Sequence, residues 1–507
     1  MILVGELSLW VALLMAAWAA TVSFAGGQMR RADLIESGER AIYATCAMAM
    51  LASLGLWTAL LTHDFSIRYV ASYTSANLPK IYTIAAFWAG PSGSLLFWAL
   101  ILSACSVIAL LTNRTRNREL LPYVSGTLAL ILVFFLATIC LGSNPFERLD
   151  FIPVEGRGLN PHLQNPGMAI QPPSLYIGYV VTAIPFAFAI ATLVTRRLDA
   201  DWLATVRRWA LLAWFFNTLG IVLGMWWAYV EVGWGGYWAW DPVENASLLP
   251  WLVNTVFLHS ITVQEKRGML RKWNVTLAVS AFLLSILGTF ITRGGAISSV
   301  RSFAQSPAGK WYAGFLIVAI VITAYLASTQ LRALGSTAEL GSVRLVVRNR
   351  RRYGGYIAHL GVVVMFAAFT GLAFKREFDL TLSPGETRDV TDPWGHRWTF
   401  LNQGISRYNI LNREVTAVAL DVSRDGKRAG VITTEKRQHV DSRGAPTFEP
   451  STEVGIMGSF KQDVYVVLQG VRGADQVEIR VAFNPLVRWV WLGGALMAIG
   501  GLVVMGA

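Results

Sequence analysis

Eleven apolar runs of membrane-spanning length recur along the 507-residue chain. A helix needs about 20 such residues to cross a bilayer, and lipid offers no partner for the backbone N–H and C=O groups of any open structure. Because 54% of the residues are hydrophobic and only 15% are charged, the composition excludes a water-soluble globule. The sequence predicts a polytopic α-helical membrane protein of about eleven transmembrane helices, at residues 5–26, 40–62, 93–112, 122–143, 174–195, 207–229, 246–263, 273–292, 309–328, 354–374 and 485–506.

The basic residues lie in small clusters between these runs. A net charge of +12 could indicate a nucleic-acid partner, but no single basic patch or stripe is present, so none is expected. Alternate connections carry twenty Lys and Arg residues against seven in the others. By the positive-inside rule, we expect the N-terminus outside the cytoplasm and the C-terminus inside it.

Residues 375–484 differ from the rest, because polar and charged residues alternate with apolar ones in segments such as REVTAVALDV, DVYVVLQGV and QVEIRVAF. This period of two is typical of half-buried strands, and Asp425-Gly426 between two such segments predicts a hairpin turn. We therefore expect a helical bundle at 1–374, an outer β-domain at 375–484 and a last transmembrane helix at 485–507.

Residues 226–251 are unusually rich in aromatic residues and contain six tryptophans, two tyrosines and a Gly-Gly pair. Tryptophan offers a wide polarizable face and prefers the boundary between lipid and water, so the stretch suits a platform for a large planar ligand such as a porphyrin. The simpler alternative is an aromatic belt that anchors helix ends. The density of the stretch and its WDPVEN ending favour the platform, built from Trp226, Trp227, Trp234, Gly235, Gly236, Tyr237, Trp238, Trp240, Asp241 and Asn245.

Two of the six histidines, His259 and His359, lie inside predicted spans, where an ionisable side chain needs a partner. Counted from the charged ends of their helices, both should lie roughly 7 to 10 Å inside the inner boundary. Two imidazoles at one depth could bind an iron axially, or each could donate to a backbone carbonyl of a neighbouring helix. The other four histidines fall in outer segments, and His162 is the one nearest to the platform.

The stretch WGGYWAWDPVENASLLPW resembles the tryptophan-rich WWD signature of haem-handling membrane proteins, and the whole chain resembles the CcmF family of haem lyase subunits in bacterial cytochrome c maturation. Further matching motifs run in the same order along most of the chain. They are FWAGPSGSLLFWALILS, LNPHLQNPG, PPSLYIGYV, LGTFITRGG, PSTEVGI and FNPLVRWVWLGG.

The resemblance implies a location in the bacterial inner membrane, with the N-terminus and the β-domain in the periplasm. It implies that His259 and His359 are the axial ligands of a b-type haem, which is reduced by quinol and reduces a transient second haem at the platform. It also implies that this second haem arrives on a CcmE-like chaperone and is joined to the CxxCH thiols of apocytochrome c, with a CcmH-like subunit handling the thiols.

The sequence departs from the family in two ways. Gln171 and Arg301 stand where the family has two outer-loop histidines that hold the second haem, and helices before the span of His359 are missing. His162 could bind the iron instead, incoming proteins could supply both ligands, or Gln171, Arg301 and Arg293 could contact the porphyrin edge. A partner subunit could also carry the missing parts. We favour a platform that holds the porphyrin face while incoming proteins contribute axial ligands.

The predicted function is therefore that of a cytochrome c haem lyase component. The alternative is a non-catalytic conduit that passes electrons or haem outward without forming thioether bonds, because the outer histidines are absent. A small-molecule transporter is disfavoured, since no matching pair of broken helices is present in two halves of the sequence.

Overall fold

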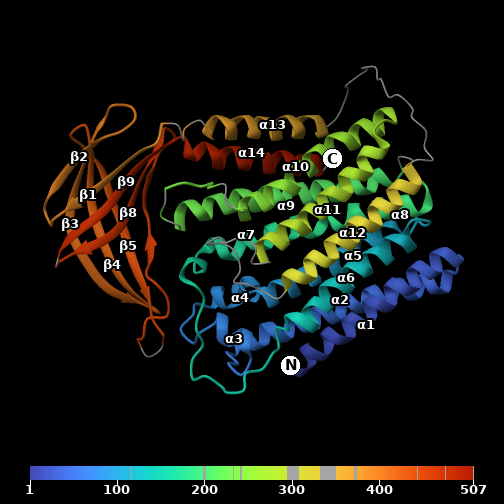
Figure 1. Ribbon diagram of the computed structural model, residues 1–507. Helices are drawn as coiled ribbons and strands as arrows, with labels where there is room; N and C mark the ends of the chain where they lie inside the picture. The colour runs from blue at the N-terminus through green and yellow to red at the C-terminus, as the bar shows by residue number, and fades with distance from the viewer. Residues whose placement is uncertain are drawn as a thin grey trace.

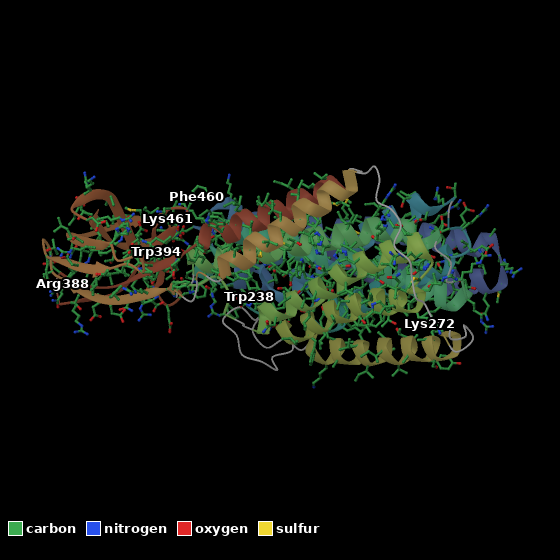
Figure 2. All side chains as sticks on the ribbon, turned by 90° about the horizontal axis from the view of Figure 1, so that it is seen from above. Trp238, Lys272, Arg388, Trp394, Phe460 and Lys461 are labelled. Atoms are coloured by element: carbon green, nitrogen blue, oxygen red, sulfur yellow. The ribbon has the colours of Figure 1, made fainter. Side chains whose placement is uncertain are left out.

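The computed structural model places a long helical bundle at one end of the molecule and a β-domain at the other (Figure 1). It describes residues 1–507 except 116, 198–200, 232, 234, 240–241, 294–307, 332–349, 370, 372–373, 442–443, 474 and 506–507. In the perpendicular view, Lys272 lies towards the far end of the bundle and Arg388 lies on the side of the β-domain facing away from the helices (Figure 2).

The described helices begin and end as follows: α1 (Ile2–Met29), α2 (Ala32–Leu61), α3 (Arg68–Tyr73), α4 (Lys80–Ala89), α5 (Pro91–Asn113), α6 (Leu121–Gly142), the 3-10 turn η1 (Pro161–Leu163), α7 (Pro166–Val181), α8 (Ala183–Thr195), α9 (Asp201–Glu231), α10 (Pro242–Arg267), α11 (Arg271–Arg293), α12 (Ala308–Leu331), α13 (Arg350–Phe369) and α14 (Val487–Met505).

Each predicted span overlaps a helix, and the span 174–195 covers two, α7 and α8. Within the described residues, ten helical segments are long and apolar enough to cross a membrane, and α13 supplies a shorter apolar segment at Ile357–Phe369. The predicted fold class, a polytopic helical membrane protein with a β-rich domain inserted before its last helix, is confirmed.

The β-domain contains nine strands in the part of the chain that is described. They are β1 (Arg376–Leu382), β2 (Thr387–Thr391), β3 (Arg397–Ile410), β4 (Arg413–Arg424), β5 (Lys427–His439), β6 (Ser451–Glu453), β7 (Gly455–Gly458), β8 (Gln462–Arg472) and β9 (Gln476–Pro485). They form two antiparallel sheets, in the orders β1-β9-β8-β7 and β2-β3-β4-β5-β6. Apolar side chains from both sheets, among them Phe400, Val422, Val466 and Phe483, share one core.

The predicted hairpin between β4 and β5 is present. Asp425 and Gly426 have φ values of 49° and 76°, the two left-handed residues that a type I′ turn requires, and Arg424 pairs with Lys427 on either side. The three alternating segments named from the sequence lie in β4, β8 and β9.

The sequence analysis missed the short helices α3 and α4, which have too few residues to show a clear period. It also placed the start of the fifth span at residue 174, eight residues after α7 begins. The structural reason is Asn165, whose side chain accepts the Gly167 N–H at 2.8 Å and caps the helix there.

Two helix pairs position the residues discussed below. Helices α13 and α14 pack closely through glycine, since a Cβ on Gly361 would lie 2.5 Å from the Gly493 carbonyl oxygen. Helices α9 and α10 are joined by two indole hydrogen bonds: Trp214 donates to Thr255 at 2.9 Å, and Trp251 donates to Thr218 at 2.8 Å. Trp251 therefore belongs to the contact between these two helices.

Candidate functional site

The two histidines of the predicted spans meet. His259 comes from α10 and His359 from α13, and their ring centroids lie 5.6 Å apart with an interplanar angle of 50°. Both side chains are exposed on the flank of the bundle. Residues that are distant in the sequence are thus brought together in the folded bundle.

One imidazole already has a fixed tautomer. His359 Nδ1 lies 2.6 Å from the carbonyl oxygen of Gly355, one turn earlier in α13, and a carbonyl can only accept. Nδ1 therefore carries the proton, and the lone pair is left on Nε2. This is the arrangement in which a neighbouring acceptor orients a histidine for metal binding through its other nitrogen.

The spacing of the pair can be compared with that of two ligands on opposite sides of one metal. Imidazole nitrogen binds a metal at about 2 Å, which puts the centroids of two opposed rings roughly 6 Å apart. The observed 5.6 Å is close to this value. Because both rings are exposed on the flank of the bundle, these two residues would be able to hold a haem iron between them.

The tryptophan-rich loop joins α9 to α10 at the end of the bundle that faces the β-domain, where Figure 2 labels Trp238. Trp226, Trp227 and Trp238 are half-buried, whereas Tyr237 is buried against Phe369 and Trp491. Asn245 is half-buried in the first turn of α10. Three further predicted platform residues lie outside the described residues: Trp234, Trp240 and Asp241.

Two local features shape this loop. Gly235 has a φ of +73°, and a Cβ there would lie 3.2 Å from Lys375 Nζ, so the backbone conformation and the close approach both favour glycine. Gly236 is buried beside it. At the start of α10, the Glu244 carboxylate accepts the Ala239 N–H at 2.8 Å, which fixes the loop against the first helical turn.

The β-domain holds the same loop from the other side. The Tyr465 hydroxyl on β8 donates to the Tyr229 carbonyl at 3.0 Å and accepts the backbone N–H groups of Gly233 and Gly235. The Tyr229 hydroxyl in turn donates to Asp463 at 3.1 Å. Burial raises the pKa of the Asp463 carboxyl, against the opposing effects of Tyr229 and Arg488. We call Tyr229, Asp463 and Tyr465 the tyrosine clamp.

The outer loop before α7 contacts the end of α9. The Trp227 indole donates to the His162 carbonyl at 3.2 Å, and His162 Nδ1 lies 3.4 Å from the buried Glu231 carboxylate. Asn165 donates to the same carboxylate at 2.8 Å. His162 is therefore next to the platform, as expected, but its imidazole faces a carboxylate.

The remaining predicted outer contacts are Gln171, Arg293 and Arg301. The Gln171 amide donates to the Gly220 carbonyl of α9 at 3.3 Å, which places it within the α7–α9 contact. Arg293 is the last residue of α11, and nothing is described of its side chain; Arg301 lies outside the described residues.

The sequence analysis missed a polar cluster where the β-domain meets the outer loop. His439 at the end of β5 is 2% exposed and pairs across strands with Arg413. Burial, together with Arg413, Arg437 and His162, lowers the pKa of His439 to about 4. Asn412, next to Arg413, donates to Gln164 of the outer loop at 3.5 Å. The sequence analysis placed His439 only in the β-domain and gave no sign that it is buried beside a loop so much earlier in the chain.

Comparison with known proteins covers the whole chain. Residues 88–297 match the family model described as cytochrome C assembly protein. The chain is 30% identical to the cytochrome c-type biogenesis protein CcmF of Haemophilus influenzae over 99% of this chain and 97% of that protein. It is also 30% identical to CcmF of Pseudomonas aeruginosa, over 98% and 95%.

A solved structure is similar in fold along the same length. The structure described as cytochrome c haem lyase CcmF superposes with a TM-score of 0.82 at 25% identity, covering 99% of this chain and 97% of that one. Both the bundle and the β-domain therefore have their counterparts in a known protein.

Proposed function

Because this chain belongs to the CcmF family of cytochrome c haem lyases, we propose that it holds a b-type haem between His259 and His359 and presents a second haem, its substrate, at the tryptophan-rich loop. The family membership makes the chain a multi-pass membrane protein of cytochrome c biogenesis and a haem lyase, which favours this function over the conduit alternative.

The observation that carries the proposal is the meeting of His259 and His359 at 5.6 Å. In this arrangement α10 and α13 present the two imidazoles, and the Gly355 carbonyl holds the His359 proton on Nδ1. When bound there, a haem would supply one-electron reduction, with quinol as the electron donor we propose. The two histidines and the Gly355 carbonyl would fix where the iron is held.

At the outer end, the half-buried indoles of Trp226, Trp227 and Trp238 would pack on the face of the substrate haem, while the tyrosine clamp keeps the loop in place. Attachment adds each cysteine S–H of the apocytochrome c CxxCH motif across a vinyl group, so that a C–S bond forms and the proton goes to the neighbouring vinyl carbon. This addition has no net redox change, and the role of the protein is placement.

We propose that incoming proteins supply the axial ligands of the substrate haem. The contacts of the candidate internal ligands support this, because His162 faces Glu231 and Gln171 donates to the α9 backbone. A CcmE-like chaperone that delivers haem, a CcmH-like thiol-handling subunit and the apocytochrome itself are the partners implied. We also propose an inner-membrane location, as the family implies. The count of basic residues supports the orientation of the three parts 1–374, 375–484 and 485–507 in which the β-domain lies in the periplasm.

The haem b assignment is tested by spectroscopy of the purified protein. His259→Ala and His359→Ala should each remove the reduced b-type spectrum, because a haem iron would then have only one imidazole to hold it. His63→Ala, which changes a histidine on the outer side, is the control and should keep the spectrum. If both span variants retain the wild-type reduced spectrum, the inner haem site is wrong.

The source of the outer ligands is tested by His162→Ala. If partners provide the ligands, this variant should still produce covalent c-type haem at near wild-type levels, measured by haem staining of denatured cytochrome c. Loss of staining with an unchanged b-type spectrum would instead make His162 the ligand.

A further inference from the structure

We propose that the β-domain rests on the outer leaflet of the bilayer through an exposed aromatic edge, made of Phe374, Trp394, Phe460 and Trp489, so that lipid is the partner of this surface. The proposal concerns how the domain is held over the membrane and does not depend on the haem sites.

The depth of this edge follows from the length of α14. That helix has 19 residues and is therefore about 28 Å long, while the hydrocarbon core of a bilayer is about 30 Å thick. With no spare length, the outer boundary of the hydrocarbon must fall at its first turn. Trp489 in that turn is 37% exposed and stands where indole side chains anchor spans.

The turn between β7 and β8 lies at the same level because it is hydrogen-bonded to the start of α14. The Trp489 indole donates to the Phe460 carbonyl at 2.9 Å, and the Leu486 N–H donates to the Lys461 carbonyl at 3.0 Å. Phe460 is 68% exposed although it is held beside a membrane span. A large apolar side chain so placed is stabilised by lipid and is costly in water.

A second pair of aromatic residues continues this edge. Phe374 follows the end of α13 and stacks on Trp394 in the β2–β3 turn, with ring centroids 6.5 Å apart and planes 24° apart. They are 59% and 51% exposed. This turn is joined to the first one, since Gln462 donates to Asp392 at 2.7 Å. Figure 2 shows Trp394 and Phe460 on the part of the β-domain nearest the helices, with Arg388 on its outer side.

Charge at this edge agrees with a lipid partner. Lys461 and Arg376 are exposed and lie close in the sequence to the aromatic residues of the edge. Arg488 in the first turn of α14 forms an ion pair with Asp463 at 3.4 Å, so its positive charge is neutralised within the protein. Exposed cations beside aromatic rings are the combination that binds lipid phosphates above an apolar boundary. Because Trp489 belongs to α14 and Phe374 follows the end of α13, the edge adjoins two apolar helices, and lipid is favoured over a protein partner.

The test uses the full-length protein in nanodiscs made of phosphatidylethanolamine and phosphatidylglycerol. The three native cysteines, Cys46, Cys105 and Cys140, are changed to alanine, and a nitroxide label is attached to Phe460→Cys. Arg388→Cys is the matched control, because it is an exposed residue of the same domain on its outer side (Figure 2). Trp394→Cys is a second test position in case Phe460→Cys does not give monodisperse protein.

Power-saturation measurements then compare collisions with oxygen, which concentrates in lipid, and with a water-soluble nickel chelate. We expect the ratio of oxygen to nickel collisions to be several-fold higher at 460 or 394 than at 388. A ratio equal to that at 388 would overturn the proposal by placing the edge in water. Shielding from both reagents would also overturn it, because it would show that a protein surface, such as a second copy of the chain, covers the edge.

Discussion

The histidine pair of α10 and α13 and the tryptophan-rich loop, which we propose lie on the inner and outer sides of the membrane, are built in opposite ways. His259 and His359 each sit within one continuous helix, and their rings come to 5.6 Å because α10 and α14, the partner of α13, both pack against α9. The outer loop depends on a separate domain. Tyr465, which lies far later in the sequence than the loop, binds the backbone of Gly233 and Gly235 as part of the tyrosine clamp.

Because of this difference, we expect different substitutions to affect the two regions. The inner pair should respond to changes of its two imidazoles and of the helix contacts behind them. The outer loop should respond to changes in its own aromatic residues, in its glycines and in the β-domain. A substitution in the outer region should therefore leave the inner pair intact.

The largest effect is expected from Trp238→Ala. Removing one indole from the platform should cost about 2 kcal/mol of binding to the substrate haem, or roughly 30-fold in affinity. Covalent c-type haem should fall accordingly, measured by haem staining, while the reduced b-type spectrum is kept. Trp238→Phe, which retains an aromatic face, should recover most of the product. Loss of the b-type spectrum in Trp238→Ala would show that the two regions are not independent.

A smaller effect is expected from Gly235→Ala. The φ of +73° should cost about 1 to 2 kcal/mol for a residue with a Cβ, and Lys375 must also move away. Gly426→Ala is the matched control, because its φ is +76° and nothing lies within 4 Å of the added Cβ. We expect only Gly235→Ala to lower cytochrome c maturation. Equal losses in both variants would mean that the effect is one of general stability.

The sequence predicted the inner region more fully than the outer one. The depths of His259 and His359 follow from counting residues from charged helix ends, which is a local property of each helix. The aromatic composition also indicated where the outer loop lies. Neither pattern could indicate that Tyr465 binds the loop backbone or that His439 approaches His162, because these contacts depend on how the β-domain docks on the bundle. Local periodicity carries no information about that docking.

Tyr465→Phe tests the docking directly, with a more modest effect. It removes the hydroxyl that donates to the Tyr229 carbonyl and accepts from the loop, at a cost of about 1 to 2 kcal/mol. Amide hydrogen exchange of residues 233–239 should become faster, while exchange in α10 around His259 is unchanged. Tyr408→Phe, which loses only an exposed bond to Glu435, is the control. Unchanged exchange in the loop would show that the tyrosine clamp does not hold it.

The smallest effect at neutral pH is expected from His439→Leu. Its effect on stability should grow as the pH falls. The pKa of His439 is lowered to about 4 in the folded protein, whereas an unfolded histidine titrates near 6.5. Between these values the unfolded state binds more protons, so stability should be complete above about pH 6.5 and should fall as the pH drops towards 4. Glu453 and Asp463, whose pKa values burial raises, act in the opposite direction. The comparison must therefore be made between the wild type and His439→Leu.

The difference in thermal unfolding temperature between these two proteins should change with pH only in that window, because the leucine has no proton to bind. The groups that face His439 come from both sides of the junction: Arg413 and Arg437 from the β-domain, and His162 from the outer loop. Acidification should therefore loosen the junction beside the outer loop while leaving the inner pair in place. A difference that stays constant from pH 7 to pH 4 would show that His439 is not held neutral there, and the outer region would then lack this link to the β-domain.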